Sequence, residues 1–220
     1  MATPDGYALY QAVLPAAEIR ALLHETRSIP RSRAGARHLL GHAPVAGIAR
    51  EPRLLAIAGG WLGAPALPFR VTLFDKNADS NWLVVWHQDT ALPLTARTAN
   101  EGWGPWSSKE GIDYAHAPAS ALERVIALRL HLDDATPDNG PLRVLPGTHR
   151  LGVLTDAQVN EQARRIEPQA CCIQAGGVMA MRPLLIHASS KSGGLQPRRV
   201  LHIEYTASME IASGIYLRAA

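Results

Sequence analysis

The sequence of 220 residues has few cysteines and no long apolar run, and both scarcities exclude classes of protein. Its two cysteines, Cys171 and Cys172, are neighbours, and adjacent side chains on a strand point to opposite faces, so they cannot easily pair. A reducing, cytoplasmic setting is the default expectation. No run approaches the roughly 18 apolar residues of a membrane span, and the first residues lack the basic and apolar regions of a signal peptide. We therefore expect a cytoplasmic protein without a membrane partner.

Lysine is scarce as well. Of the 22 Lys and Arg residues only three are lysines (Lys76, Lys109 and Lys191), and the formal net charge is +3. A basic chain rich in arginine raises the hypothesis of nucleic-acid binding, but a genomic preference for arginine codons explains the same count. The segment from Arg27 to Arg53 contains one acidic residue and six arginines, namely Arg27, Arg31, Arg33, Arg37, Arg50 and Arg53. It has little aromatic interleaving and no recognised binding motif, which argues against nucleic acid as the partner.

Several common catalytic motifs are absent. The sequence has no Gly-x-x-x-x-Gly-Lys phosphate loop, no Gly-x-Gly-x-x-Gly after a strand, no Gly-x-Ser-x-Gly elbow and no Cys-x-x-Cys zinc spacing. What is present is a composition of 47% hydrophobic and 19% charged residues, typical of a folded globular chain. The length suits one domain that folds without disulfides or a structural metal. Histidines and carboxylates remain as candidates for chemistry.

The hydrophobic pattern changes along the chain. Ile19, Leu22 and Thr26 recur at helical spacing after Pro15, and a second helix is predicted from Glu51-Pro52 onward. A short helix is expected at 155–166. From residue 67 the period is two, and strands are predicted at 67–75, 82–89, 122–133, 142–145, 169–174, 178–181, 184–187 and 198–206.

About eight short strands after a helical lead predict a mainly β fold, a double-stranded β-helix (a cupin-like jelly roll) with helices packed on one sheet. We expect a single domain, 1–220, with a helical lead at 1–65 and a jelly-roll core at 66–206. A long insert at 90–120 contains Trp103, Trp106 and Tyr114. Structureless stretches of this length are unusual inside a domain and often bind ligands. These aromatic residues either form a lid over a substrate pocket, which we favour, or anchor the loop.

The first candidates for chemistry are His87 and Asp89, at the end of an apolar strand. Because side chains alternate on a strand, Leu83 and Val85 are predicted to share their face. An imidazole and a carboxylate so placed can reach one metal ion, although His-x-Asp alone is more often a surface pair. His187 ends a second apolar strand and supplies a third ligand. Two histidines and one carboxylate form the facial triad of non-haem Fe(II) oxygenases, which leaves positions open for an oxo-acid and dioxygen.

The strand after His187 begins with Arg198-Arg199, and a guanidinium can bind a carboxylate through two parallel hydrogen bonds. Two arginines that merely open an edge strand are the alternative. Arg198 shares a polar face with His202, whereas Arg199 shares an apolar face with Leu201. We expect the apolar face to pack outward under the helices and the polar face to line the metal cavity, which favours Arg198.

The same alternation assigns other polar side chains to the cavity. Arg70 and Thr72 are expected to contact the cofactor, and Arg129 and His131 to line the substrate pocket together with Trp103 and Trp106 of the insert. For His131, a role as a satisfied core histidine is equally compatible with the pattern.

Four motifs carry a family resemblance. They are Trp86-His87-Gln88-Asp89; Asp138-Asn139-Gly140-Pro141-Leu142 through Pro146-Gly147-Thr148-His149; His187-Ala188-Ser189; and Pro197-Arg198-Arg199. In this order and spacing, over residues 82–206, the sequence resembles the phytanoyl-CoA dioxygenase family of Fe(II)- and 2-oxoglutarate-dependent oxygenases.

The resemblance implies that His87, Asp89 and His187 bind iron in a double-stranded β-helix. It also implies that Arg198, eleven positions after His187, binds the far carboxylate of 2-oxoglutarate, supported by the hydroxyl of Ser189. A strand-end serine that caps a turn is the other interpretation of Ser189.

The expected protein is an oxidoreductase, a non-haem iron 2-oxoglutarate-dependent dioxygenase. It would hydroxylate a small-molecule substrate with dioxygen and release succinate and CO2. A cupin-like metal-dependent isomerase or hydrolase would use the same ligands without a dicarboxylate clamp, and a basic nucleic-acid-binding protein is the third hypothesis. The substrate, the position hydroxylated and the oligomeric state do not follow from the sequence.

Overall fold

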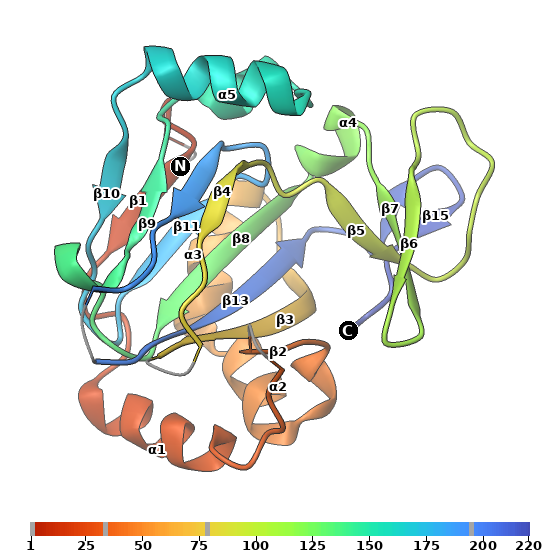
Figure 1. Ribbon diagram of the computed structural model, residues 1–220. Helices are drawn as coiled ribbons and strands as arrows, with labels where there is room; N and C mark the ends of the chain where they lie inside the picture. The colour runs from red at the N-terminus through yellow and green to blue at the C-terminus, as the bar shows by residue number, and fades with distance from the viewer. Residues whose placement is uncertain (1–2, 33–34, 78–79, 194–195) are drawn as a thin grey trace.

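The structure is a computed structural model that describes residues 3–32, 35–77, 80–193 and 196–220. Two antiparallel β-sheets face each other in a jelly roll, with helices outside them and a smaller lobe at one end (Figure 1). The mainly β fold agrees with the prediction. No helix in the described part of the chain is long and apolar enough to cross a membrane.

The major sheet has six strands in the order β1-β11-β8-β13-β3-β2. Their bounds are Tyr7–Tyr10 (β1), Gly35–Ala36 (β2), Leu67–Lys76 (β3), Val125–His131 (β8), Val178–Met181 (β11) and Arg198–Thr206 (β13). The central strand β13 pairs with β3 from Arg198 onward, and the first shift in their pairing falls between Glu204 and Tyr205. Side chains therefore alternate regularly along most of β13, and this decides which of them face inward.

The minor sheet has four strands in the order β10-β9-β12-β4. Their bounds are Val84–His87 (β4), Leu142–Val144 (β9), Gln169–Cys171 (β10) and His187–Ser189 (β12). His187 was predicted to end a strand, but it begins β12, because residues 183–185 form a turn and bend. Both Cys171, in β10, and Cys172 are free thiols, as their adjacency predicted.

Residues 90–120, predicted as a structureless insert, form a third sheet that we call the lobe. Its strands, in the order β5-β7-β6, are Ala91–Leu94 (β5), Ile112–His116 (β7) and Trp106–Lys109 (β6). Glu110 and Gly111 join β6 to β7 with φ of 51° and 79°, the left-handed backbone of a two-residue hairpin turn. Next to the lobe, a fourth sheet consists of β14 (Glu210–Ala212) and β15 (Ile215–Tyr216).

The predicted helices are present. The α-helices are Ala16–Thr26 (α1), Ala43–Ala49 (α2), Pro52–Leu62 (α3), Ala119–Leu122 (α4) and Asp156–Arg165 (α5), and the 3-10 helices are Leu39–Gly41, Pro137–Asn139 and Thr148–Leu151. Pro15 precedes α1, and the Glu51 carboxylate accepts from the backbone N–H groups of Arg53 and Leu54 at the start of α3. β1 and β2 lie within the lead that was predicted to be helical.

The outer face of the major sheet carries the largest apolar core. Leu201 and Ile203 of β13 are fully buried there with Leu54 and Trp61 of α3. Burying such a side chain contributes about 1.5–3 kcal/mol. On the opposite side of the molecule α5 covers part of the minor sheet, where its Val159 joins a small apolar cluster. The apolar face of β13 thus packs outward under helices, as predicted, and its polar face is turned to the space between the sheets.

The space between the two sheets has two parts, a packed apolar cluster and a cavity. Apolar side chains, among them Leu142, Cys171 and Met179, form one cluster there. A cavity of about 230 Å³ lies beside it and is lined by charged and aromatic side chains from both sheets and from the lobe. The jelly roll therefore has a packed part and a polar, hollow part, and the hollow part contains the predicted site.

Candidate metal centre and anion site

A bulge in the edge strand β4 turns His87 into the cavity. His187 of β12 pairs with His87, and Ser189 pairs with Val84, so three steps along β4 face two along β12. Both Val84 and His87 consequently line the cavity, while Leu83 and Val85 are 56% and 67% exposed. The prediction that Leu83 and Val85 share the face of His87 was wrong, because a bulge interrupts the alternation.

His87, Asp89 and His187 form a cluster whose potential ligand atoms all lie within 4.8 Å of one another. The two carboxylate oxygens of Asp89 are 3.6 Å from His87 Nε2 and 3.5 Å from His187 Nε2. The Asp89 backbone N–H donates to the carbonyl of Pro183 at 2.9 Å, which holds the residue in place beyond the end of β4. The three side chains thus converge on a single point.

The outer nitrogens of both imidazoles are already engaged. Nδ1 of His87 bonds the Val85 carbonyl at 2.9 Å, and Nδ1 of His187 bonds the Leu185 carbonyl at 2.8 Å. An Nδ1–H that donates in this way leaves Nε2 with a free lone pair facing Asp89, the usual arrangement of a metal-binding histidine.

Charges in the cluster suit a metal ion. Burial lowers the pKa of His187 to about 4, so its imidazole is neutral at pH 7. Burial would raise the pKa of Asp89, but the neighbouring His187 and the bonded His87 hold it well below its ordinary value. A carboxylate with two imidazole nitrogens is the donor set of the facial triad that binds non-haem Fe(II). These residues fit that ion by number, type and position.

A second cluster, the anion site, consists of Lys76, Ser189 and Arg198, all buried and all lining the same cavity. Lys76 Nζ donates to Ser189 Oγ at 2.9 Å, and Arg198 Nη2 donates to it at 3.1 Å. No carboxylate of the described residues pairs with either cation. Burial lowers the pKa of Lys76 to about 8, with Arg198 as the next cause, and burial lowers that of Arg198 to about 10. Two buried, uncompensated cations mark a site for an anion.

The Asn139-Gly140 pair supports this site from behind through its backbone. The carbonyl of Asn139 accepts from Arg198 Nε at 3.3 Å, and that of Gly140 accepts from Ser189 Oγ at 2.9 Å. Gly140 has φ +66°, and a Cβ there would lie 2.4 Å from the Ser190 carbonyl oxygen. The Asn-Gly motif and the distant His-x-Ser and Arg motifs therefore belong to one structural unit.

Arg199 lies on the opposite face of β13 from Arg198. Its Nε and Nη2 both donate to the carboxylate of Asp133 at 2.7 Å, and its backbone N–H bonds the same group. The structure thus places Arg198 in the cavity and Arg199 outside it, in a bidentate ion pair.

Arg70, Thr72 and Arg129, predicted to face the cavity, all line it. The guanidinium of Arg70 forms an ion pair with buried Glu204 and donates to the Ala91 carbonyl at 3.1 Å, so its charge is already compensated. Arg129 is buried, its Nη1 lies 3.2 Å from Nδ1 of His202, and its Nε has no hydrogen-bond partner among the described residues.

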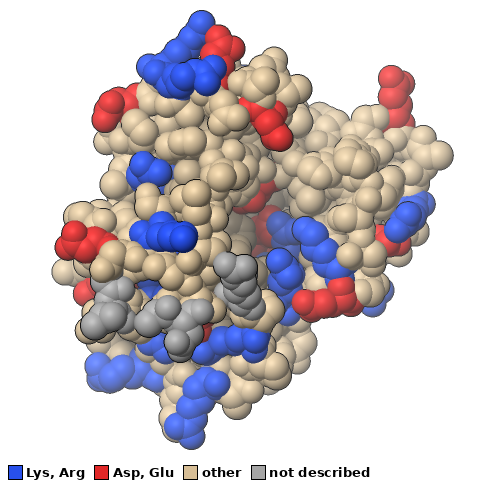
Figure 2. Space-filling view, in the orientation of Figure 1, with Lys and Arg blue, Asp and Glu red and all other residues tan. Residues whose placement is uncertain are grey.

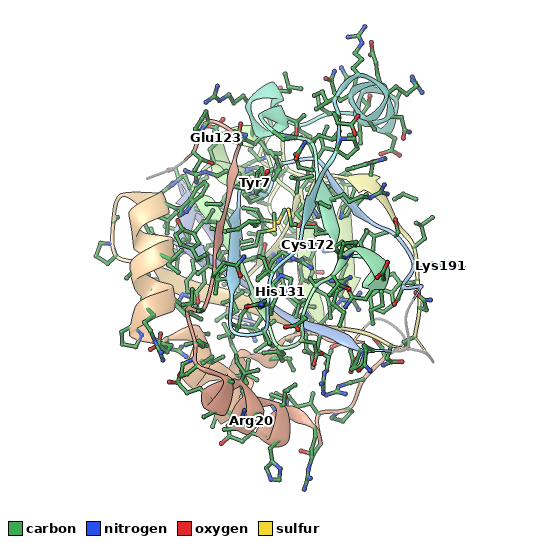
Figure 3. All side chains as sticks on the ribbon, turned by 90° about the vertical axis from the view of Figure 1, so that its left-hand side faces the viewer. Tyr7, Arg20, Glu123, His131, Cys172 and Lys191 are labelled. Atoms are coloured by element: carbon green, nitrogen blue, oxygen red, sulfur yellow. The ribbon has the colours of Figure 1, made fainter. Side chains whose placement is uncertain are left out.

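His131, Trp103 and Trp106 are not among the residues that line the cavity. His131, the last residue of β8, is buried in the interior (Figure 3), and neither ring nitrogen has a hydrogen-bond partner within the described part of the chain. Burial lowers its pKa to about 3. Trp103 and Trp106 pack against the apolar cluster beneath the lobe. Tyr114, in contrast, is buried, and its ring lines the cavity.

The arginines of the 27–53 segment are dispersed in the structure. Arg31 pairs with Asp75 at 2.6 Å, and Arg53 pairs with both Glu18 and Glu51. Arg33 lies outside the described residues. Arg37 is the member that lines the cavity. This separation does not form the continuous basic surface that a nucleic-acid backbone requires.

Besides the apolar residues Phe74, Val84 and Leu142, four cavity residues were not assigned from the sequence: Lys76, Trp82, Arg37 and Lys109. Lys76 has the same parity as Arg70 and Thr72, so extending the predicted strand by one residue identifies it. Trp82 lies near it, with Lys76 Nζ 5.4 Å from the ring centroid. Arg37 and Lys109 reach the cavity through tertiary packing, for which the sequence carries no local signal.

A larger cavity of about 440 Å³ lies elsewhere, lined by residues such as Leu122, His149 and Arg182. The metal-ligating cluster found among the described residues lies in the smaller cavity, which also contains the anion site. We therefore assign function to the smaller one. Figure 2 shows a hollow near the centre of the face in view, with acidic atoms at its floor and Lys and Arg side chains along its edge below the lobe.

Fold and site together define a class: jelly-roll oxygenases that bind Fe(II) by a His-Asp-His cluster and 2-oxoglutarate beside it. The family model for phytanoyl-CoA dioxygenase (PhyH) matches residues 3–200. The chain belongs to this family, whose members are Fe(II)- and 2-oxoglutarate-dependent oxygenases. The match begins well before residue 82, where the blocks that carry the sequence resemblance begin, and ends at residue 200.

Among individual proteins, one curated relative shares a quarter of its aligned residues with this chain. L-proline trans-4-hydroxylase of Streptomyces griseoviridis is 25% identical over 184 residues, which are 72% of this chain and 61% of that protein. The chain thus spans less than two thirds of this relative's length.

Two solved structures show the same fold. The epimerase SnoN from nogalamycin biosynthesis, in complex with Fe3+, alpha-ketoglutarate and nogalamycin RO, has a TM-score of 0.75 at 18% identity over 98% of this chain and 82% of its own. EctD from S. alaskensis with 2-oxoglutarate and 5-hydroxyectoine has a TM-score of 0.69 at 21% identity, over 93% and 73%.

Proposed function

We propose that this protein is an Fe(II)- and 2-oxoglutarate-dependent dioxygenase that hydroxylates a small molecule. The observation that carries the proposal is one cavity with two neighbouring clusters: His87, Asp89 and His187 at one place, and Lys76, Ser189 and Arg198 at another. When bound, Fe(II) and 2-oxoglutarate supply the chemistry, in which dioxygen gives one atom to succinate and one to a substrate C–H bond, with release of CO2.

The chain's own residues hold and orient these reactants. His87, His187 and Asp89 would bind the metal on one side and leave its other side to the cavity. Arg198, Lys76 and Ser189 would bind the far carboxylate of 2-oxoglutarate, the two cations by charge and the serine by its hydroxyl. Such a clamp selects a diacid by length as well as charge. Phe74, Val84 and Leu142 line the cavity too and exclude water from part of it.

The relatives support a small substrate. The named substrate of the S. griseoviridis relative is the amino acid L-proline. The cavity of about 230 Å³ lies below the common range of roughly 300–1,000 Å³ for ligand pockets and must also contain 2-oxoglutarate. Little space remains for a large substrate group inside it.

The direct test is spectroscopic. Fe(II) and 2-oxoglutarate are added to the purified protein under argon, where their chelate gives a visible charge-transfer band. We expect the band with the wild-type protein and its loss in His87→Ala and Asp89→Ala, because each variant lacks a metal ligand. A wild-type protein without a band, or variants that keep it, would contradict the proposal.

A cupin-like isomerase or hydrolase is the second candidate function, because it would use the same three ligands. It has no need for Lys76, Ser189 and Arg198, which is why the oxygenase is preferred. Succinate release and oxygen consumption separate the two, since an isomerase or hydrolase produces neither change.

A further inference from the structure

Two cations stand at the lobe end of the cavity. Arg37 follows β2, and Lys109 ends β6; both line the cavity and both are exposed. Neither side chain has a hydrogen bond or an ion pair with any described residue. Lys109 Nζ instead lies 4.7 Å from the ring centroid of Tyr114. These two side chains are therefore available to a ligand that enters the cavity.

Lys109, which lies on the Tyr114 ring, is separated from the anion site by more than half of the length of β3. Arg37 directly follows Ala36, which pairs with Leu73, so it lies nearer the middle of that strand. Lys76 of the anion site and Arg70 at the lobe end are six positions apart on that strand, or about 20 Å at a rise of about 3.3 Å per residue. Arg70 lies 5.5 Å from the Tyr114 centroid on which Lys109 rests. His87 pairs with His187, which is two positions from Ser189 of the anion site, and Asp89 lies close enough to Arg70 to raise its pKa. The metal centre therefore lies between the two ends. A cosubstrate bound to Arg198 and the metal therefore leaves the lobe end of the cavity free.

The cavity has an excess of positive charge that the cofactors do not remove. Six cationic side chains line it, namely Arg37, Arg70, Lys76, Lys109, Arg129 and Arg198. Against them stand the carboxylates of Asp89 and Glu204, which leaves a net excess of four. Fe(II) and 2-oxoglutarate carry equal and opposite charges, so loading both leaves this excess unchanged.

The six cations differ in whether a carboxylate or the proposed cosubstrate compensates their charge. Arg70 is paired with Glu204, and Lys76 and Arg198 face the cosubstrate. Arg37 and Lys109 have no such partner, and the buried Arg129 contacts His202 but no carboxylate of the described residues. Burial lowers the pKa of Lys109, with the nearby Arg70 and Arg37 as the next causes. An anion at this end would stabilise both charges.

Hydrogen bonds connect the segment that contains Arg37 to the hairpin that contains Lys109. His38, next to Arg37, bonds the Tyr114 hydroxyl through Nε2 at 2.8 Å, and its Nδ1 lies 3.3 Å from the Glu110 carboxylate. Glu110 follows Lys109 in the hairpin turn. The segment that contains Arg37 is thus tied to the hairpin that contains Lys109, which preorganises the pair for one small ligand.

We propose that the substrate is a small organic anion whose carboxylate or phosphate group binds Arg37 and Lys109 while its reacting carbon faces the metal centre. This inference rests on the proposed function and adds the substrate class to it. Tyr114 positions Lys109 through its ring and borders the path between the anionic group and Asp89. The cavity volume restricts the substrate to a small molecule.

The test uses probes of matched shape. Protein loaded with Fe(II) and excess 2-oxoglutarate under argon is titrated with trifluoroacetate and, separately, with trifluoroacetamide, and binding is followed by 19F line broadening. We expect trifluoroacetate to bind at least about tenfold more tightly than the neutral amide. Arg37→Gln and Lys109→Gln should each weaken trifluoroacetate binding about fivefold to tenfold and leave the amide unaffected.

Arg97→Gln is the matched control. Arg97 lies in the lobe, pairs with Asp113 at 3.0 Å and does not line the cavity, so its loss removes the same charge elsewhere. Its affinity for trifluoroacetate should equal that of the wild type. Equal binding of the acid and the amide, or equal affinities of all three variants, would overturn the inference.

A second arm separates carboxylates from phosphates and connects binding to turnover. Amino acids with their primary amides and phosphate monoesters with their alcohols are compared for stimulation of succinate release. A compound without the anionic group that stimulates more than its carboxylate or phosphate counterpart would overturn the inference while leaving the oxygenase proposal intact. Loss of the visible band in the wild-type protein would instead overturn the proposed function.

Discussion

Lys76 and Arg198 lie directly opposite each other on β3 and β13 and donate to the same acceptor, Ser189 Oγ. Like charges at opposed positions of a sheet destabilise it, and here both are also buried. A carboxylate bound between them would reduce both the repulsion and the cost of their desolvation. We therefore expect a bound carboxylate, rather than another residue of the chain, to compensate the charges of Lys76 and Arg198.

The two neighbouring arginines should give opposite phenotypes. Arg198→Ala should raise the KM for 2-oxoglutarate about 30-fold or more, because truncating one partner of a buried charge pair costs about 2–5 kcal/mol. Arg199→Ala should leave that KM near the wild-type value and lower the free energy of unfolding by about 1–3 kcal/mol through the loss of the Asp133 pair. Steady-state kinetics and urea denaturation measure the two effects. The reverse ranking of KM values would contradict the placement of the clamp.

Lys76 should make 2-oxoglutarate use depend on pH. Its pKa is lowered to about 8, so the ammonium is charged below that pH and is lost as the pH rises through it. The kcat/KM for 2-oxoglutarate, which reports the free enzyme, should therefore fall between about pH 7 and 9. In Lys76→Met, the kcat/KM for 2-oxoglutarate should be about tenfold lower than in the wild type at pH 7 and should not change across this pH interval. A wild-type profile that is flat, or a variant that keeps the decline, would assign the titration to another group.

Gly140 should be intolerant of a side chain for two separable reasons. Its left-handed backbone costs an L-residue about 1–2 kcal/mol, and a Cβ would also meet the Ser190 carbonyl oxygen at 2.4 Å. Gly140→Ala should therefore destabilise the protein by more than this amount and raise the KM for 2-oxoglutarate through Ser189. Gly147→Ala is the control, because Gly147 has φ +81° but open space around its Cβ position. Equal losses in urea denaturation for the two variants would show that the contact with Ser190 is unimportant.

The buried ion pair of Arg70 and Glu204 should behave as a unit. Glu204→Gln should lower the free energy of unfolding by about 3–5 kcal/mol, because it leaves the Arg70 guanidinium without its partner in the interior. The double variant Arg70→Met, Glu204→Leu should recover much of that loss. Chemical denaturation of Arg70→Met, Glu204→Leu and their double variant completes the cycle, and additive losses would show that the pair is not coupled.

Strand alternation was sufficient to predict the inner face of β13 from the sequence. Arg198 lies inside and Arg199 outside because pairing is regular along this part of the strand. The same rule failed on β4, where the bulge exposes Val85 and turns Val84 and His87 inward. A bulge depends on the partner strand, so the local sequence of an edge strand does not reveal it.

The lobe escaped prediction for a different reason. The β6–β7 turn is Glu110-Gly111, whereas two-residue hairpins are usually signalled by Asn-Gly or Asp-Gly. Without that signal the segment was interpreted as a loop, and Lys109 was not assigned to the site. The His38–Tyr114 contact joins residues 76 positions apart and depends on the folded structure.

Under the proposed function, the lobe would affect the choice of substrate without holding the iron or the cosubstrate. Its sheet shares no strand with the two sheets that hold the metal and anion sites, and it reaches the cavity through Lys109 and Tyr114. It packs on the major sheet through an apolar cluster that includes Phe69 of β3 and Val125 of β8. Exchanging the 106–116 hairpin would alter the entrance while leaving the iron ligands and the cosubstrate clamp on their original strands. We therefore expect the hairpin to be the segment whose exchange changes substrate specificity with the least effect on the binding of iron and 2-oxoglutarate.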